Sequence, residues 1–159
     1  MRIFGKTFAY WKEYGGGAFL GIFFSVFIFW INPELSKWRN FIQEIPNISM
    51  CVFGFLLTFL GIILQGVSKT IEWMKSKNIL FHRFVSFNKR VVILSFILSI
   101  YAYFLGYFNF EWFQKLLNCS YFFEILQKFL ISSFMFLFVW FVIDTVQFIK
   151  IFYLLIKKD

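Results

Sequence analysis

Asp144 is the residue best placed to carry membrane chemistry, because it is the only acid or base well inside a predicted apolar span. An unpaired charge in hydrocarbon costs several kcal/mol, so an ionisable residue there is a candidate for a functional role. A structural role competes with it, in which Asp144 lies near the membrane surface and forms an ion pair. The candidate ion-pair partners are Lys89, Arg90 and Lys150. A proton relay or ion site would instead need Gln65, Asn88 or Gln147.

Small and polar residues recur at helical spacing along one segment, and large apolar residues occupy the positions between them. This seam comprises Asn47, Cys51, Gly54, Thr58, Gly61, Gln65, Ser68 and Glu72. Small residues let another helix approach closely in a bilayer, whereas hydroxyls and amides can replace ion hydration, so the seam is either a helix-packing surface or a pore lining. A second seam follows at Asn88, Ser95, Ser99, Ala102, Gly106 and Asn109. We expect the two helices to pack seam to seam.

Other reactive groups are few. With one His and two Cys, the chain lacks the ligands of an ordinary Cys/His zinc site. It has no nucleophile near the His, no paired acids in an apolar stretch and no phosphate-binding loop. We therefore expect no enzymatic activity, metal or other cofactor. Cys51 and Cys119 fall on the same predicted side of the membrane, where a disulfide and two free thiols both remain open.

The composition is that of an integral membrane protein. Hydrophobic residues make up 60% and aromatic residues 26% of the 159 residues, above the range of soluble globular proteins. The net charge of +8 would indicate nucleic acid binding in a soluble protein. Here the basic residues flank apolar runs, so membrane orientation and anionic lipid account for them and no direct nucleic acid binding is expected.

The apolar stretches predict one all-α membrane domain with four transmembrane helices, at residues 17–31, 48–67, 91–110 and 129–149. Residues 1–14 place aromatic and basic side chains on opposite arcs, which predicts an amphipathic helix on the membrane surface. The three glycines at 15–17 then break or bend the chain. Gly17, Gly21 and Ser25 share the small-xxx-small spacing, which favours packing within the chain over a dimer interface.

Residues 68–90 are the most basic segment, and their apolar spacing predicts a helical hairpin that extends beyond the membrane. Twelve of the 16 Lys and Arg residues lie before the first span, in this hairpin or after the last span. The positive-inside rule therefore places both termini and the hairpin in the cytoplasm of a bacterial cell, with the spans in its inner membrane. The basic residues that could bind a cytoplasmic protein partner or lipid are Lys69, Lys75, Lys77, Arg83, Lys89 and Arg90.

This layout, with a basic cytoplasmic segment at residues 66–90 leading into the span at 91–100, resembles small four-pass membrane proteins of bacterial antiphage defence operons, of the Kiwa membrane-subunit type. The resemblance implies a homo-oligomer that senses or responds to infection at the inner membrane together with a cytoplasmic partner. The resemblance is one of overall layout, so it assigns a role to no individual residue.

Two other functions remain open. A pore, holin-like or small transporter component would conduct, with Gln65 or Asp144 accessible to water. An immunity protein against a pore-forming toxin would act by contact within the membrane and would conduct nothing. The protein is non-enzymatic under all three interpretations.

Overall fold

The computed structural model describes residues 2–3, 6–31, 34–65, 72, 76, 78–108 and 120–156. In this part of the chain two short strands, β1 (Arg2–Ile3) and β2 (Lys6–Thr7), pair in antiparallel orientation. Four helices account for nearly all the rest: α1 (Phe8–Ile31), α2 (Leu35–Gln65), α4 (Asn78–Tyr107) and α6 (Ser120–Ile156). The fold class predicted from the sequence is therefore confirmed at the level of helical architecture.

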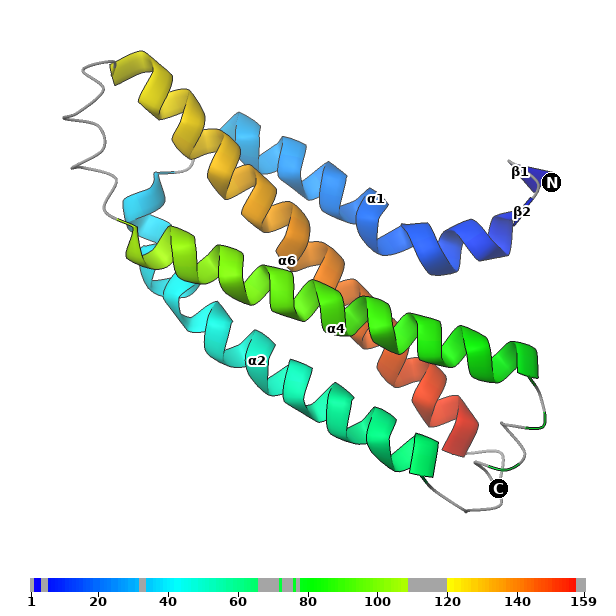
Figure 1. Ribbon diagram of the computed structural model, residues 1–159. Coiled ribbons are helices and arrows are strands. Elements are labelled where there is room, and N and C mark those ends of the chain that lie inside the picture. Colours follow the sequence, from blue (N-terminus) through cyan, green and yellow to red (C-terminus); the bar gives the residue numbers. More distant parts are fainter. Residues whose placement is uncertain are drawn as a thin grey trace.

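The four helices run alternately in opposite directions, so α1 begins and α6 ends at the same end of the bundle (Figure 1). α1 packs along α6, and α2 packs along α4. Contacts between α4 and α6 join these two helix pairs. α1 and α2 consequently lie on opposite sides of the bundle (Figure 1).

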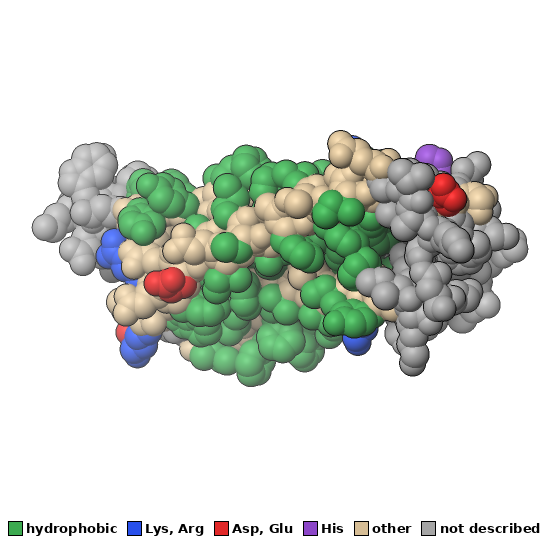
Figure 2. Space-filling model, turned by 90° about the horizontal axis from the view of Figure 1, so that it is seen from below, with side chains coloured by type: hydrophobic (Ala, Val, Ile, Leu, Met, Phe, Trp, Pro, Cys, Tyr) green, Lys and Arg blue, Asp and Glu red, His purple; other side chains and the backbone are tan. Residues whose placement is uncertain are grey.

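Three helices are long and apolar enough to cross a membrane: all of α2, the segment Phe84–Tyr107 of α4, and the segment Tyr121–Tyr153 of α6. The apolar part of α1, Gly15–Ile31, is shorter. Figure 2 shows hydrophobic side chains over the middle of the molecule and charged side chains toward its two ends. Bulky apolar side chains on this surface include Phe19 and Trp30, which are 75% and 86% exposed. Such a surface suits lipid better than water.

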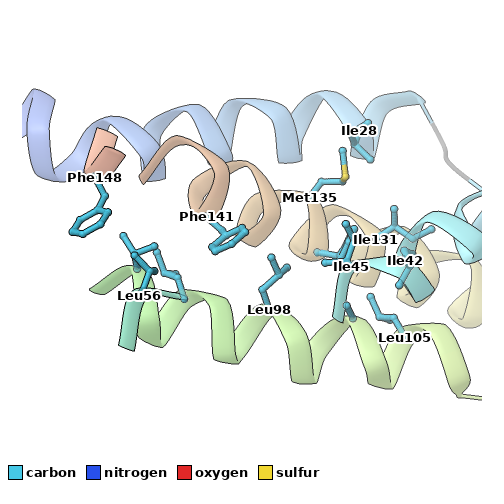
Figure 3. Packing of buried hydrophobic residues seen from close by; sticks show 14 of the residues in the cluster. Ile28, Ile42, Ile45, Leu56, Leu98, Leu105, Ile131, Met135, Phe141 and Phe148 are labelled. Atoms are coloured by element: carbon cyan, nitrogen blue, oxygen red, sulfur yellow. The ribbon is translucent and has the colours of Figure 1, made fainter. Parts of the chain in front are cut away.

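The core is built by side chains from all four helices (Figure 3). Ile28 of α1 lies beside Met135 of α6, and Ile42 and Ile45 of α2 lie near Ile131 of α6 (Figure 3). Toward the other end of the bundle the packing becomes aromatic. The ring centroid of Phe59 on α2 is 6.0 Å from that of Phe148 and 4.3 Å from that of Phe152, both on α6.

The helix bounds differ from the sequence prediction at the start of the chain. α1 begins at Phe8 and continues through the three glycines, whereas we predicted a separate surface helix at residues 1–14. Glycine costs up to about 1 kcal/mol of helix propensity, but tertiary packing can outweigh that cost. Gly17 and Gly21 lie directly against α6, which is the packing that favours a helix here.

α2 is also longer than predicted, because it begins at Leu35 and contains Pro46 in its interior. We predicted that the second span starts only at residue 48, after this proline. Pro46 has no N–H to donate to the Ile42 carbonyl, so this hydrogen bond is missing from the helix. One turn farther, the Ser49 hydroxyl donates to the carbonyls of Ile45 at 2.9 Å and Pro46 at 3.2 Å. α6 likewise begins nine residues before the predicted span, at Ser120.

Candidate functional site

A buried ion pair joins α4 to α6. The Nε atom of Arg90 lies 2.9 Å from Oδ2 of Asp144, whose side chain is completely buried, while the Arg90 side chain is 22% exposed. The Arg90 guanidinium also lies 4.5 Å from the centroid of the Phe87 ring, a cation–π distance. Arg90 is one of the three partners predicted from the sequence. The charge of Asp144 is thus compensated within the apolar segments of two helices.

The backbone of α1 also packs against the Asp144 carboxylate. A Cβ atom at Gly17 would lie 2.7 Å from Oδ1 of Asp144 and 2.7 Å from Cδ1 of Trp140. Real Cβ atoms do not approach other atoms so closely, so only glycine fits at position 17. Asp144 therefore contacts α1 through the Gly17 backbone and α4 through Arg90, and it ties three helices together.

The polar residues that a proton relay would need are not gathered around Asp144. Gln147 is the nearest, one turn farther along α6, where its amide nitrogen would lie 3.8 Å from a Cβ at Gly16. Asn88 is fully buried but is directed to α2, where it donates a 3.4 Å hydrogen bond to the Leu56 carbonyl. Gln65 is exposed at the end of α2. The arrangement favours the structural role of Asp144 over the relay.

The prediction that two small-residue seams pack against each other is wrong for α2. A Cβ at Gly54 or Gly61 would have no atom within 4 Å, and Thr58 is exposed, donating a 2.9 Å hydrogen bond to the Gly54 carbonyl of its own helix. Cys51 and Gln65 are exposed as well, whereas Ser68 lies outside the described residues. The buried residues of α2 are Leu35, Ile42, Ile45, Ser49, Leu56 and Ile63.

Five residues of the α4 seam lie inside the bundle, and the sixth, Asn109, lies outside the described residues; the buried five are Asn88, Ser95, Ser99, Ala102 and Gly106. Its partner is the apolar face of α2. A groove of small residues on one helix accepts large side chains from its neighbour, so a second small seam is not needed. At Gly106 the approach is closest: a Cβ there would lie 2.8 Å from Cγ of Gln43. The Gly106 carbonyl accepts hydrogen bonds from Arg39 Nε at 3.1 Å and Gln43 Nε2 at 2.9 Å.

The small residues of α1 face α6, which confirms the expected packing within the chain. A Cβ at Gly21 would lie 2.8 Å from the Phe136 carbonyl oxygen. One turn farther, the Ser25 and Ser132 hydroxyls lie 3.0 Å apart, and Ser132 also donates to the Ser25 carbonyl. The part played by Ser132 was not predicted, although its small polar type inside an apolar span was the available signal.

The basic hairpin lies largely outside the described residues, which is the case for Lys69, Lys75 and Lys77. Arg83 belongs to α4, and Lys89 is exposed on the same helix. We had predicted that Arg90 could bind a partner or lipid at the surface. It forms the buried ion pair with Asp144 instead. Cys51 is a free, exposed thiol, and Cys119 lies outside the described residues, so the structure does not show the candidate disulfide.

Among the described residues, no group of His, Cys, Asp and Glu side chains is arranged to hold a metal ion. No family model, curated protein or solved structure matches this chain. The contacts and exposed surfaces of its own helices are therefore the basis for a proposal of function.

Proposed function

We propose that this chain is a four-pass protein of a bacterial inner membrane, with both termini in the cytoplasm, that acts as a non-enzymatic homo-oligomeric subunit of an antiphage defence system. The apolar lengths of α2, α4 and α6 support three crossings. The apolar part of α1, Gly15–Ile31, has 17 residues, or about 26 Å at 1.5 Å per residue, which is close to a hydrocarbon core of about 30 Å. Its direction, opposite to that of α6, also supports a fourth crossing.

The oligomer is supported by a surface of small and polar residues on α2, which we call the α2 stripe. It comprises the exposed residues Cys51, Gly54, Thr58 and Gln65 and the half-buried Gly61. Bulky side chains flank it, such as Phe55 and Ile62, which are 61% and 59% exposed. Figure 2, seen from below, shows a band of polar side chains and backbone across the hydrophobic surface. Small residues offer little surface for van der Waals contact with lipid, whereas a second helix can approach them closely and pack. A second copy of α2 is the partner that we propose.

A sensor or effector role in defence, working with a cytoplasmic protein, is supported by the basic segment at residues 66–90, whose second half forms the start of α4. Lys89, in this part of α4, is exposed. The packing of Asp144 with Arg90 and Gly17 makes α1, α4 and α6 one connected unit. A partner bound at the start of α4 would therefore act on three helices together.

A pore formed by several copies is the second candidate. It is favoured by the exposed side chains of Thr58 and Gln65, which share the α2 stripe. In an oligomer joined through α2 these groups would line the contact between copies, where a hydroxyl and an amide could bind ions or water. Ion and dye flux from liposomes that contain the purified protein separates the two roles. Tight liposomes support a sensor, and flux that disappears in Gln65→Leu establishes a pore.

The defence role is tested by phage plating on the native host with the gene intact, deleted, or carrying Gly54→Leu and Gly61→Leu together. We expect deletion and the double variant to raise plating of at least one phage in a diverse panel. Phe55→Leu, a matched change beside the stripe, should leave plating at the level of the intact gene. Equal plating on intact and deleted strains across the panel would contradict a role in defence.

A further inference from the structure

A groove of about 480 Å³ lies between α1 and α6, toward the end of the bundle where α1 ends and α6 begins. This volume falls within the range of about 300–1,000 Å³ typical of small-molecule sites. Apolar side chains form the walls, among them Val26 and Phe29 of α1 and Phe129 and Phe136 of α6. Val26 and Phe129 are 58% and 62% exposed, so the groove is open to whatever surrounds the two helices.

The polar floor of the groove does not require a polar ligand. Its Ser25 and Ser132 hydroxyls bond to each other at 3.0 Å, and Ser132 donates to the Ser25 carbonyl. Ser133 donates to the Leu130 carbonyl at 3.0 Å. These hydroxyl groups are thus satisfied within the protein, and those of Ser25 and Ser132 also hold the two helices together. The space above them suits an apolar chain.

One end of the groove carries groups that suit a lipid headgroup. Trp30, near the end of α1, lines the groove and is 86% exposed, and tryptophan is enriched at the level of lipid headgroups. Lys128 lies one helical turn before Ser132, on the same face of α6, and directly precedes Phe129. It is half-buried, and the ion pairs of the described residues do not include it. Glu124, the nearest acid along α6, is exposed one turn farther away.

We propose that this groove binds one anionic phospholipid, with an acyl chain between α1 and α6, the glycerol region at Trp30 and the phosphate at Lys128. The fit rests on the combination of an apolar channel, a tryptophan at its mouth and, beside it, a cation that is in no ion pair with the described residues. A zwitterionic lipid would fill the same channel but would gain less from Lys128. The proposal depends on the proposed membrane crossing of α1 and α6, and not on the oligomer or on defence.

Native mass spectrometry of the full chain in detergent, with equal amounts of phosphatidylglycerol and phosphatidylcholine of identical acyl chains, tests this assignment. One basic residue near an anionic surface contributes about 1 kcal/mol, so we expect about a fivefold preference for phosphatidylglycerol. Lys128→Gln should abolish the preference while lipid is still retained. Lys150→Gln, an exposed cation at the opposite end of α6, should leave the preference unchanged.

Val26→Trp separates the channel from the headgroup contact, because it fills the groove from an exposed position and should lower retention of both lipids. Equal binding of the two lipids by the unmodified chain would overturn the proposal, as would a preference that survives Lys128→Gln. A change of oligomer size in Val26→Trp, with lipid retention unaltered, would instead show the groove to be a protein interface. The Gly54→Leu and Gly61→Leu changes should leave lipid retention intact. A failure of the proposed oligomer can therefore be distinguished from a failure of the proposed lipid site.

Discussion

The absence of a side chain at Gly17 makes room for the carboxylate of Asp144, since a Cβ at position 17 would lie 2.7 Å from Oδ1 of Asp144. The same carboxylate is 2.9 Å from Arg90 through its other oxygen. A glycine on α1 and a cation on α4 thus hold one buried acid on α6 from two directions. This relationship explains how an acid can be buried within an apolar span.

Substitution of Gly17 should weaken the contact between α1 and α6. Gly17→Ala forces Asp144 and Trp140 to move, and overpacking of this kind costs typically 1–3 kcal/mol. Gly61→Ala is the matched control, because a Cβ there meets open space. Thermal unfolding in one detergent should give a lower midpoint for Gly17→Ala and an unchanged or slightly higher midpoint for Gly61→Ala. Equal midpoints for the two variants would show that α1 is not packed as described.

Removal of one partner of the buried ion pair should cost more than removal of both. Arg90→Gln leaves the Asp144 carboxylate uncompensated, a change that costs about 3–5 kcal/mol for buried pairs. Arg90→Gln together with Asp144→Asn leaves no buried charge and should recover much of that loss. A double-mutant cycle on stability in detergent measures the coupling.

Lys89→Gln is the control for this cycle, since Lys89 is the exposed neighbour of Arg90. It should change stability little. Additive effects of the Arg90 and Asp144 substitutions would mean that the pair does not form. A Lys89→Gln variant that is as unstable as Arg90→Gln would also contradict the ion pair.

The hydroxyl of Tyr101 links α4 to α6, because it lies 2.6 Å from the Ser133 hydroxyl and 3.2 Å from the Leu130 carbonyl. Tyr101→Phe removes these bonds without changing the ring, and we expect a loss of about 0.5–1.5 kcal/mol in the free energy of unfolding. Tyr103→Phe alters a tyrosine that is 61% exposed and should have a smaller effect. If both substitutions have the same effect, the hydrogen bonds of Tyr101 do not contribute.

Sequence patterns predicted which residues share a helix face, but not which face meets a neighbour. Gly54, Thr58 and Gly61 do share one face of α2, yet that face is exposed. In water, hydrophobicity would determine which face of a helix packs against its neighbour. In a bilayer both small and bulky residues can face lipid, so periodicity leaves the choice open.

The charged contacts were more predictable, because an acid in hydrocarbon must be compensated and few cations were available. Arg90 was accordingly one of three candidates for Asp144. The continuity of α2 through Pro46 was not predictable from propensity, since proline disfavours a helix interior and only the packing of α2 against α4 can outweigh that preference. A helix is therefore present at each predicted span, whereas the separate surface helix predicted at residues 1–14 is wrong and the bounds at glycine and proline depend on tertiary contacts.

Cross-linking through Cys51 tests the proposed oligomer most directly, because this free, exposed thiol lies on the α2 stripe, one turn before Gly54. The experiment uses native membranes, a Cys119→Ser background and mild oxidation. We predict a disulfide-linked dimer that is lost in Cys51→Ser, strongly reduced by Gly54→Leu and Gly61→Leu together, and retained in Phe55→Leu. A chain that stays monomeric at every oxidant level, or a dimer equally abundant in the leucine variant, would contradict assembly through α2.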